Sequence, residues 1–179
     1  MKNALIVIDM QNDFITGSLG SEDAQAVVPA IVKRIRSGFY DDIFATRDTH
    51  KDDYMDTLEG QKLPVPHCIK DTEGWQIQKD IRKALDDMNG DSYVQIIDKY
   101  TFGSLLLPTK IRDSIEMIDI VGVCTDICVI SNALSLRMFY PNMPIRVIAN
   151  ECAGVTPELH EAALKVMQSC QIDVVGENA

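Results

Sequence analysis

Three side chains that can take part in hydrolysis follow apolar runs of the sequence. Asp9 comes directly after the first run, Lys99 follows the third, and Cys128 lies a few residues beyond the fourth, where a helix is expected to begin. Parallel strands end at one edge of their sheet, so these groups can converge on one crevice. There the thiol can attack a carbonyl group while the carboxylate carries its proton. A helix N-terminus and a neighbouring lysine favour the thiolate, so we expect the thiol pKa to lie below its usual value of about 8.5.

Each of these residues also has an ordinary structural role. A single cysteine such as Cys128 is commonly a buried thiol, an aspartate after a strand commonly caps a turn, and a lysine is commonly solvated. Only their convergence would make a site.

A second group of polar residues occupies the long segment 47–74. Asp48, His50 and His67 offer one carboxylate and two imidazoles, a donor set that suits zinc, iron or manganese and leaves positions for water. Connections of this length in compact domains are usually functional, although the same residues can also brace the loop by hydrogen bonds. The remaining histidine, His160, is expected on the surface of the last helix.

The apolar runs alternate with stretches of helical periodicity. Short, nearly continuous runs are typical of strands buried on both faces, and the predicted strands are Ala4–Ile8, Ile43–Thr46, Tyr93–Ile97, Met117–Val123, Ile145–Ala149 and Ile172–Val175. The predicted helices are Glu22–Ser37, Trp75–Met88, Leu105–Asp113, Asp126–Phe139 and Pro157–Gln168. This order predicts an α/β fold, a Rossmann-like three-layer α/β/α sandwich with a mostly parallel central sheet of about six strands. Without a linker or repeat, residues 1–179 are expected to form a single domain.

Composition excludes several classes of protein. A formal net charge of −10 disfavours nucleic acid and anionic membranes as partners. The apolar run Ala4–Ile8 is too short for a signal peptide, and no run approaches the roughly 18 apolar residues of a membrane span, so a cytoplasmic location is expected. Five cysteines, an odd number, argue against a disulfide framework.

Three segments of the sequence resemble the signature motifs of one superfamily. They are IVIDMQNDF at positions 6–14, DKYTFGS at 98–104 and VGVCTDICV at 121–129. They resemble the isochorismatase-like cysteine hydrolases, which include nicotinamidases and N-carbamoylsarcosine amidases. The resemblance implies that Asp9, Lys99 and Cys128 form a catalytic triad.

The resemblance also implies two further parts of the site. A cis peptide is expected at Val123–Cys124, and it would direct the N–H groups of Cys124 and Cys128 at one point as an oxyanion hole. The family usually has a small residue such as alanine at position 124, and cysteine is also small. RDTH at 47–50 and PHC at 66–68 resemble the metal-ligand motifs of nicotinamidases, with Asp48, His50 and His67 as the ligands.

The substrate pocket departs from the nicotinamidase pattern. Nicotinamidases often have a tryptophan shortly before the His-Cys pair, whereas this chain reads LPVPHC there, and the usual glycine is replaced by Asp71 in KDTEGW. Phe14 is retained as one wall of the pocket. Tyr54, Trp75 and Phe102 are the candidates for the missing stacking partner, and each can equally serve in packing.

We therefore expect a cysteine-dependent amidohydrolase for a small amide, with hydrolysis of nicotinamide to nicotinate and ammonia through a thioester as the leading candidate. A divalent metal and a homo-oligomer, dimer or tetramer, are implied by the resemblance, and no organic cofactor is expected. The alternatives are an isochorismatase-type or N-carbamoyl amidase reaction on another small metabolite, and a catalytically silent binding module. The presence of Cys128 disfavours the vinyl-ether cleavage of isochorismate, which needs no thiol.

Overall fold

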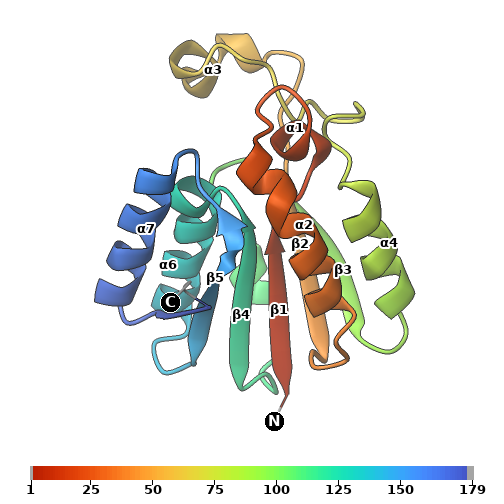
Figure 1. Cartoon of the computed structure of the whole chain (residues 1–179), viewed down its shortest axis with the longest axis vertical. Helices are drawn as coiled ribbons and strands as arrows, with labels where there is room; N and C mark the ends of the chain where they lie inside the picture. The colour runs from red at the N-terminus through yellow and green to blue at the C-terminus, as the bar shows by residue number, and fades with distance from the viewer. Residues whose placement is uncertain (1, 177–179) are drawn as a thin grey trace.

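The computed structural model describes residues 2–176, which are built around one parallel sheet (Figure 1). Its strands run in the order β3-β2-β1-β4-β5-β6, and each neighbouring pair is parallel. The strands are β1 (Asn3–Ile8), β2 (Asp42–Asp48), β3 (Tyr93–Lys99), β4 (Met117–Val123), β5 (Ile145–Ala153) and β6 (Asp173–Val175). The predicted fold class is thereby confirmed.

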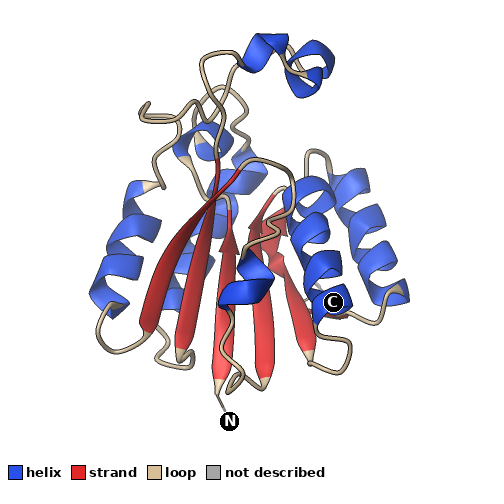
Figure 2. Ribbon diagram, turned by 180° about the vertical axis from the view of Figure 1, so that it is seen from behind, coloured by secondary structure: helices blue, strands red, loops and turns tan. Residues whose placement is uncertain are grey.

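Helices cover both faces of the sheet. The longer ones are α2 (Glu22–Ile35), α4 (Lys79–Met88), α6 (Ile130–Phe139) and α7 (Pro157–Ser169), and the shorter ones are α1 (Asn12–Ile15), η1 (Tyr54–Asp56), α3 (Leu58–Lys62), α5 (Leu107–Lys110) and the π-turn η2 (Thr125–Val129). Helices α2 and α4 pack on one face, and α5, α6 and α7 pack on the other (Figures 1 and 2). Helix α3 rises above the carboxyl ends of the strands (Figure 1).

The central strands show why the sequence adopts this arrangement. Strand β1 is buried along its whole length, with Leu5 and Val7 in the core beneath α2 and α4 and Ile6 and Ile8 in the core beneath α6 and α7. Burying one such side chain fully contributes roughly 1.5–3 kcal/mol. A strand that must fill two cores reads as a continuous apolar run rather than an alternating one.

Helix starts follow capping rules. The Ser21 hydroxyl accepts a hydrogen bond from Ala24 N at the start of α2, and the Thr156 hydroxyl accepts one from Leu159 N at the start of α7, where Pro157 takes the first helical position. Each such cap contributes about 1 kcal/mol. The predicted start of the last helix is therefore confirmed.

Three predicted helices differ from the observed ones. The segment predicted as Trp75–Met88 becomes helical only at Lys79, because Ile77 forms a β-bridge with Gln11 and Gln78 caps the helix. The segment predicted as Leu105–Asp113 forms only the single turn α5. The segment predicted as Asp126–Phe139 opens with the π-turn η2 before α6 begins.

The strand order reverses between β1 and β4, and this is the point at which open α/β sheets bind ligands. Gly122 permits the close approach of the two strands there, because its φ is +121° and a Cβ would lie 2.2 Å from the Ile8 carbonyl oxygen. None of the helices between residues 2 and 176 is long and apolar enough to cross a membrane.

Candidate active site

The three predicted catalytic side chains meet at this switch point. Asp9 follows β1 with a φ of 49°, Lys99 is the last residue of β3, and Cys128 lies in η2 after β4. The Lys99 Nζ atom lies 2.7 Å from Asp9 Oδ2 and 3.5 Å from Cys128 Sγ. All three side chains are buried. Lys99 is 90 positions from Asp9 and 29 positions from Cys128 in the sequence, so it is the fold that brings the three residues together.

The length of the lysine side chain accounts for this contact. Strand β3 is separated from β1 by β2, so the Lys99 ammonium must extend past the end of β2 to reach Asp9. On the way it donates to Asp48 Oδ1 at 3.1 Å and to the Thr101 carbonyl at 3.2 Å. Four polar atoms therefore surround one buried ammonium, which offsets part of the cost of removing it from water.

Asp9 is held by a neighbouring strand. The Thr46 hydroxyl donates to Asp9 Oδ1 at 2.6 Å, and the Asp9 N–H donates to the Thr46 hydroxyl oxygen at 3.1 Å. Burial raises the pKa of the Asp9 carboxyl, partly opposed by the charge on Lys99. A carboxylate of raised pKa is a stronger base than a solvated one.

The electrostatics of the thiol differ from the expectation of a lowered pKa. Burial raises the pKa of Cys128 well above its ordinary value, and the negative charge of Asp9 adds to this effect. Lys99 lowers the pKa but is outweighed. Burial opposes the charge on Lys99 itself, yet Asp9, Cys128 and Asp48 raise the pKa of its ammonium overall. The expected lowering of the Cys128 pKa is therefore wrong, because burial and Asp9 together outweigh Lys99.

The backbone beside the thiol has the expected unusual form. The Val123–Cys124 peptide bond is cis, and η2 begins directly after it. Ile127 and Val129 both donate their N–H groups to the Cys124 carbonyl. Burial raises the pKa of Cys124 to about 12, so this thiol stays protonated near neutral pH.

A second cluster of ligand-type side chains adjoins the triad. This metal-type cluster consists of Asp48, His50, Glu59 and His67. Each of the four residues offers one ligand atom, and these atoms lie within 4.8 Å of one another. His50 Nε2 lies 2.9 Å from Asp48 Oδ2 and 3.7 Å from Glu59 Oε1. The three predicted ligands are therefore brought together, and Glu59 of α3 joins them as a fourth.

Charge and hydrogen bonding show that this cluster fits a divalent cation. Asp9, Asp48 and Glu59 supply three carboxylates, and Lys99 is the ammonium that lies against two of them. A bound dication would balance the remaining charge. His67 Nδ1 is 2.8 Å from the Val65 carbonyl, an arrangement that leaves Nε2 free for a metal. Two imidazoles with two carboxylates are ordinary ligands of zinc, iron and manganese.

Buried contacts brace the loop that bears Asp48 and His50. The buried Gln11 side chain donates to the Asp48 carbonyl at 2.8 Å and accepts from Asp48 N at 2.7 Å. The Trp75 indole N–H donates to the Thr49 hydroxyl at 2.9 Å, while the Arg47 guanidinium stacks 3.6 Å from the centre of the indole ring. Burial opposes the charge of Asp48, but bonds with His50 and His67 hold the pKa of this carboxyl well below its usual range. Contacts within the chain thus hold these side chains in place.

The predicted pocket residues fall into different environments. Phe14 lies with its ring centre 5.5 Å from that of His67, and Tyr54 packs against both His50 and His67 at 4.7 and 5.0 Å. Tyr54 is buried, and its hydroxyl donates to the Leu63 carbonyl. Phe102 is about half exposed on the loop after Lys99.

Trp75 occupies the position of a packing residue. It is buried, bonded to Thr49 and covered by Arg47, as described above. Of the three candidate stacking partners, Tyr54 therefore lies beside the metal-type cluster and Phe102 lies closest to solvent.

His160 differs from its expected place on the surface. It is partly buried, and its Nδ1 lies 2.8 Å from the hydroxyl of Thr125, a fully buried residue that begins η2. In the same region Val155 N donates to Asp126 Oδ1. The start of α7 therefore contacts the turn that carries Cys128. The helical position of His160 gave no sign of this contact, because it depends on how α7 docks.

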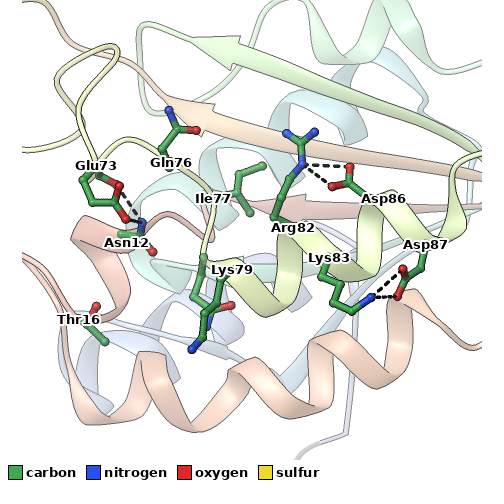
Figure 3. A pocket seen from close by; sticks show the side chains of 11 residues that line it. Asn12, Thr16, Glu73, Gln76, Ile77, Lys79, Arg82, Lys83, Asp86 and Asp87 are labelled. Carbon is green, nitrogen blue, oxygen red and sulfur yellow. Dashed lines mark hydrogen bonds and ion pairs between the residues drawn. The ribbon is translucent and has the colours of Figure 1, made fainter.

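A separate groove of about 870 Å³ lies between α1, residues 73–78 and α4 (Figure 3). Most of the residues that line it are polar or charged, with the ion pairs Arg82–Asp86 and Lys83–Asp87 along one side. It contains neither the triad nor the metal-type cluster, so the chemistry described above does not take place in it.

Comparisons with known proteins agree with this geometry. Residues 3–178 match the Isochorismatase domain. The nicotinamidase of Schizosaccharomyces pombe is 27% identical over 97% of this chain and 93% of its own length. The crystal structure of nicotinamidase/pyrazinamidase from Bacillus subtilis has a TM-score of 0.85 and 29% identity, covering 98% of this chain and 100% of that one. The crystal structure of pyrazinamidase from Pyrococcus horikoshii in complex with zinc has a TM-score of 0.78 and 26% identity, covering 98% and 99% of the two chains.

Proposed function

Because the chain belongs to the isochorismatase family, we propose that it is a cysteine-dependent amidase that hydrolyses nicotinamide or a closely similar small amide. The observation that carries this proposal is the contact of one buried ammonium, Lys99, with both Asp9 and Cys128 at 2.7 and 3.5 Å. The nicotinamidase relatives, which align along nearly the whole chain, support the choice of substrate. An isochorismatase-type reaction would have no use for this thiol.

In the proposed first step, Asp9 accepts the Cys128 proton as the sulfur attacks the amide carbonyl carbon. A carbon–sulfur bond forms, and the carbonyl electron pair moves to oxygen. The N–H groups of Cys124 and Cys128 stabilise that oxyanion. Lys99 keeps its proton throughout and stabilises the charge that develops on sulfur.

The second step releases ammonia. Asp9 returns the proton to the amide nitrogen, the carbon–nitrogen bond breaks and a thioester remains on Cys128. Water then attacks the thioester while Asp9 accepts one of its protons. The carbon–sulfur bond then breaks, and Asp9 returns its proton to the departing sulfur. The carboxylic acid leaves, and both the Cys128 thiol and the Asp9 carboxylate are restored.

The metal-type cluster adjoins this chemistry through Asp48, which contacts both Lys99 and His50. We propose that Asp48, His50, Glu59 and His67 hold a divalent metal, with zinc, iron or manganese compatible with the donors. A metal bound there supplies a Lewis acid that can orient a polar atom of the substrate. Phe14 and Tyr54, which pack against the histidines, are the proposed walls for a flat ring.

The predicted cytoplasmic location and homo-oligomeric state stay predictions of this proposal. Light scattering of the purified protein tests the second, and cell fractionation tests the first.

The proposal is tested by ammonia release from nicotinamide, pyrazinamide and carbamoyl compounds. We expect Cys128→Ser to abolish release while the fold is kept. Cys170→Ser is the matched control, because Cys170 directly follows α7 and is partly exposed. Equal activity of the Cys128→Ser variant and the unmodified protein would overturn the thiol mechanism. Activity confined to carbamoyl compounds would overturn the choice of substrate.

A further inference from the structure

A buried asparagine links the helix of Cys128 to the loop that follows Lys99. Asn132 lies in α6, four residues after Cys128, and is fully buried. Its Nδ2 donates to the Cys128 carbonyl at 2.8 Å and to the Phe102 carbonyl at 3.2 Å. Its Oδ1 accepts a hydrogen bond from Ser104 N at 2.9 Å. One amide group therefore makes three hydrogen bonds, one to the nucleophile's own residue and two to the loop.

These bonds link the residue of the thiol, through the loop, to the lysine that contacts the same thiol. The tethered loop also contains Thr101, whose carbonyl accepts a hydrogen bond from the Lys99 ammonium. Lys99 in turn contacts Cys128 Sγ at 3.5 Å. A displacement of the loop would therefore move one of the groups that fix the ammonium relative to the sulfur. Phe102, which the sequence made a candidate for the substrate pocket, lies on the same loop.

The chemistry of the amide makes this side chain hard to replace. Two of its partners are acceptors and one is a donor, so only a group with both functions satisfies all three. A buried carbonyl or N–H that loses its partner destabilises the folded chain. The loop between residues 100 and 106 has few apolar anchors of its own, since Tyr100, Phe102, Leu105 and Leu106 are all exposed.

We propose that Asn132 is a positioning residue for the amidase reaction. It holds the loop after Lys99 at a fixed position relative to Cys128. This inference rests on the proposed function, since it assigns Asn132 a role through Cys128 and Lys99 rather than through contact with substrate.

A threonine substitution separates the bond that Asn132 makes to Cys128 from the two bonds that it makes to the loop. On a helix, a threonine hydroxyl can donate to the carbonyl four residues earlier, which for position 132 is that of Cys128. Asn132→Thr therefore keeps a bond to the Cys128 carbonyl and loses both bonds to the loop. Misplaced catalytic groups lose one to two orders of magnitude in rate. We expect both kcat and the rate of Cys128 alkylation by iodoacetamide, itself a small amide, to fall about tenfold or more.

The matched control is Ser104→Ala. The Ser104 hydroxyl accepts a hydrogen bond from Leu107 N, so its loss weakens the same loop while the Ser104 N–H can still donate to Asn132. We expect this variant to lower Tm but to keep near-normal alkylation and kcat. Asn132→Ser also keeps a bond to the Cys128 carbonyl and loses both bonds to the loop. It is measured instead if Asn132→Thr does not fold.

The inference is overturned if Asn132→Thr keeps alkylation and kcat within twofold of the unmodified protein, or if Ser104→Ala reduces both equally. Alkylation needs no substrate and is measured by peptide mapping with fragmentation, which distinguishes Cys128 from the other four cysteines. If the unmodified protein releases no ammonia from any amide, the proposed function fails while the alkylation result still decides the role of Asn132.

Discussion

Replacing Asp9 by asparagine separates the two roles that we propose for the triad, namely forming the thiolate and transferring its proton. Asparagine has the same shape, tolerates the left-handed φ of 49° and can still accept the Thr46 hydroxyl, so we expect the fold to persist. The variant loses the negative charge that pairs with Lys99 at 2.7 Å.

The direction of the effect on Cys128 follows from the charges. Asp9 raises the pKa of the thiol and Lys99 lowers it, so the loss of Asp9 lets Lys99 act with less opposition. At 3.5 Å and an effective dielectric constant of about 20, two opposite unit charges attract by about 5 kcal/mol. The thiolate should therefore form at lower pH in Asp9→Asn than in the unmodified protein.

Turnover should respond in the opposite sense. Without a carboxylate to carry the proton to the leaving nitrogen, we expect kcat to fall by about 10²- to 10⁴-fold. The assay is the rate of iodoacetamide alkylation against pH, measured beside ammonia release from nicotinamide. The reasoning is refuted if the alkylation curve of Asp9→Asn moves to higher pH, or if its kcat stays close to that of the unmodified protein.

Three further predictions concern the residues around the triad. Glu59→Gln should weaken retention of a divalent metal, measured by competition with a chelator, and leave Cys128 alkylation nearly unchanged. Trp75→Phe should lose about 1 kcal/mol of stability with the bond to Thr49, measured by urea unfolding, and leave KM nearly unchanged. His160→Leu frees the Thr125 hydroxyl and should lower kcat more than KM, with partial recovery in His160→Gln.

Each of these predictions has a result that contradicts it. Unchanged metal retention in Glu59→Gln would remove Glu59 from the proposed ligand set. A large rise in KM for Trp75→Phe would show that the indole contacts the substrate and does not only support the loop through Thr49. Equal kinetics for His160→Leu and the unmodified protein would show that the contact with Thr125 is structural alone.

The positions of Asp9, Lys99 and Cys128 could be predicted because they depend on rules that act over short stretches. Apolar runs define the strands, parallel strands end at one edge, and polar residues at those ends converge on the switch point. The resemblance to isochorismatase-like hydrolases is confirmed by the family match over residues 3–178. The cis bond at Val123–Cys124 followed from the same resemblance.

Glu59 and Asn132 could not be found in this way. Glu59 lies on a five-residue helix in a segment without periodicity, and its approach to His50 depends on how that excursion folds back over the sheet. Asn132 lies within a predicted helix, and its sequence context does not indicate which groups its side chain contacts. Its role depends on three partners in the folded chain, two of them about 30 residues away.

The thiol pKa was mispredicted for a related reason. The helix N-terminus and Lys99 are visible in sequence, and both favour a thiolate. The extent of burial and the second charge, Asp9, become apparent only in the folded structure, and they outweigh Lys99. Local motifs thus identified the side chains that converge at the switch point, whereas their electrostatic balance depended on packing.

The central claim is that Cys128 forms a thioester with the acyl group of a small amide. The most direct measurement is the intact mass of the protein quenched in acid within milliseconds of mixing with nicotinamide, followed by peptide mapping. The account predicts an added nicotinoyl group on Cys128, absent from Cys128→Ser and present in the Cys170→Ser control. Turnover of nicotinamide with no acyl group on Cys128, or with the group on another residue, would contradict it.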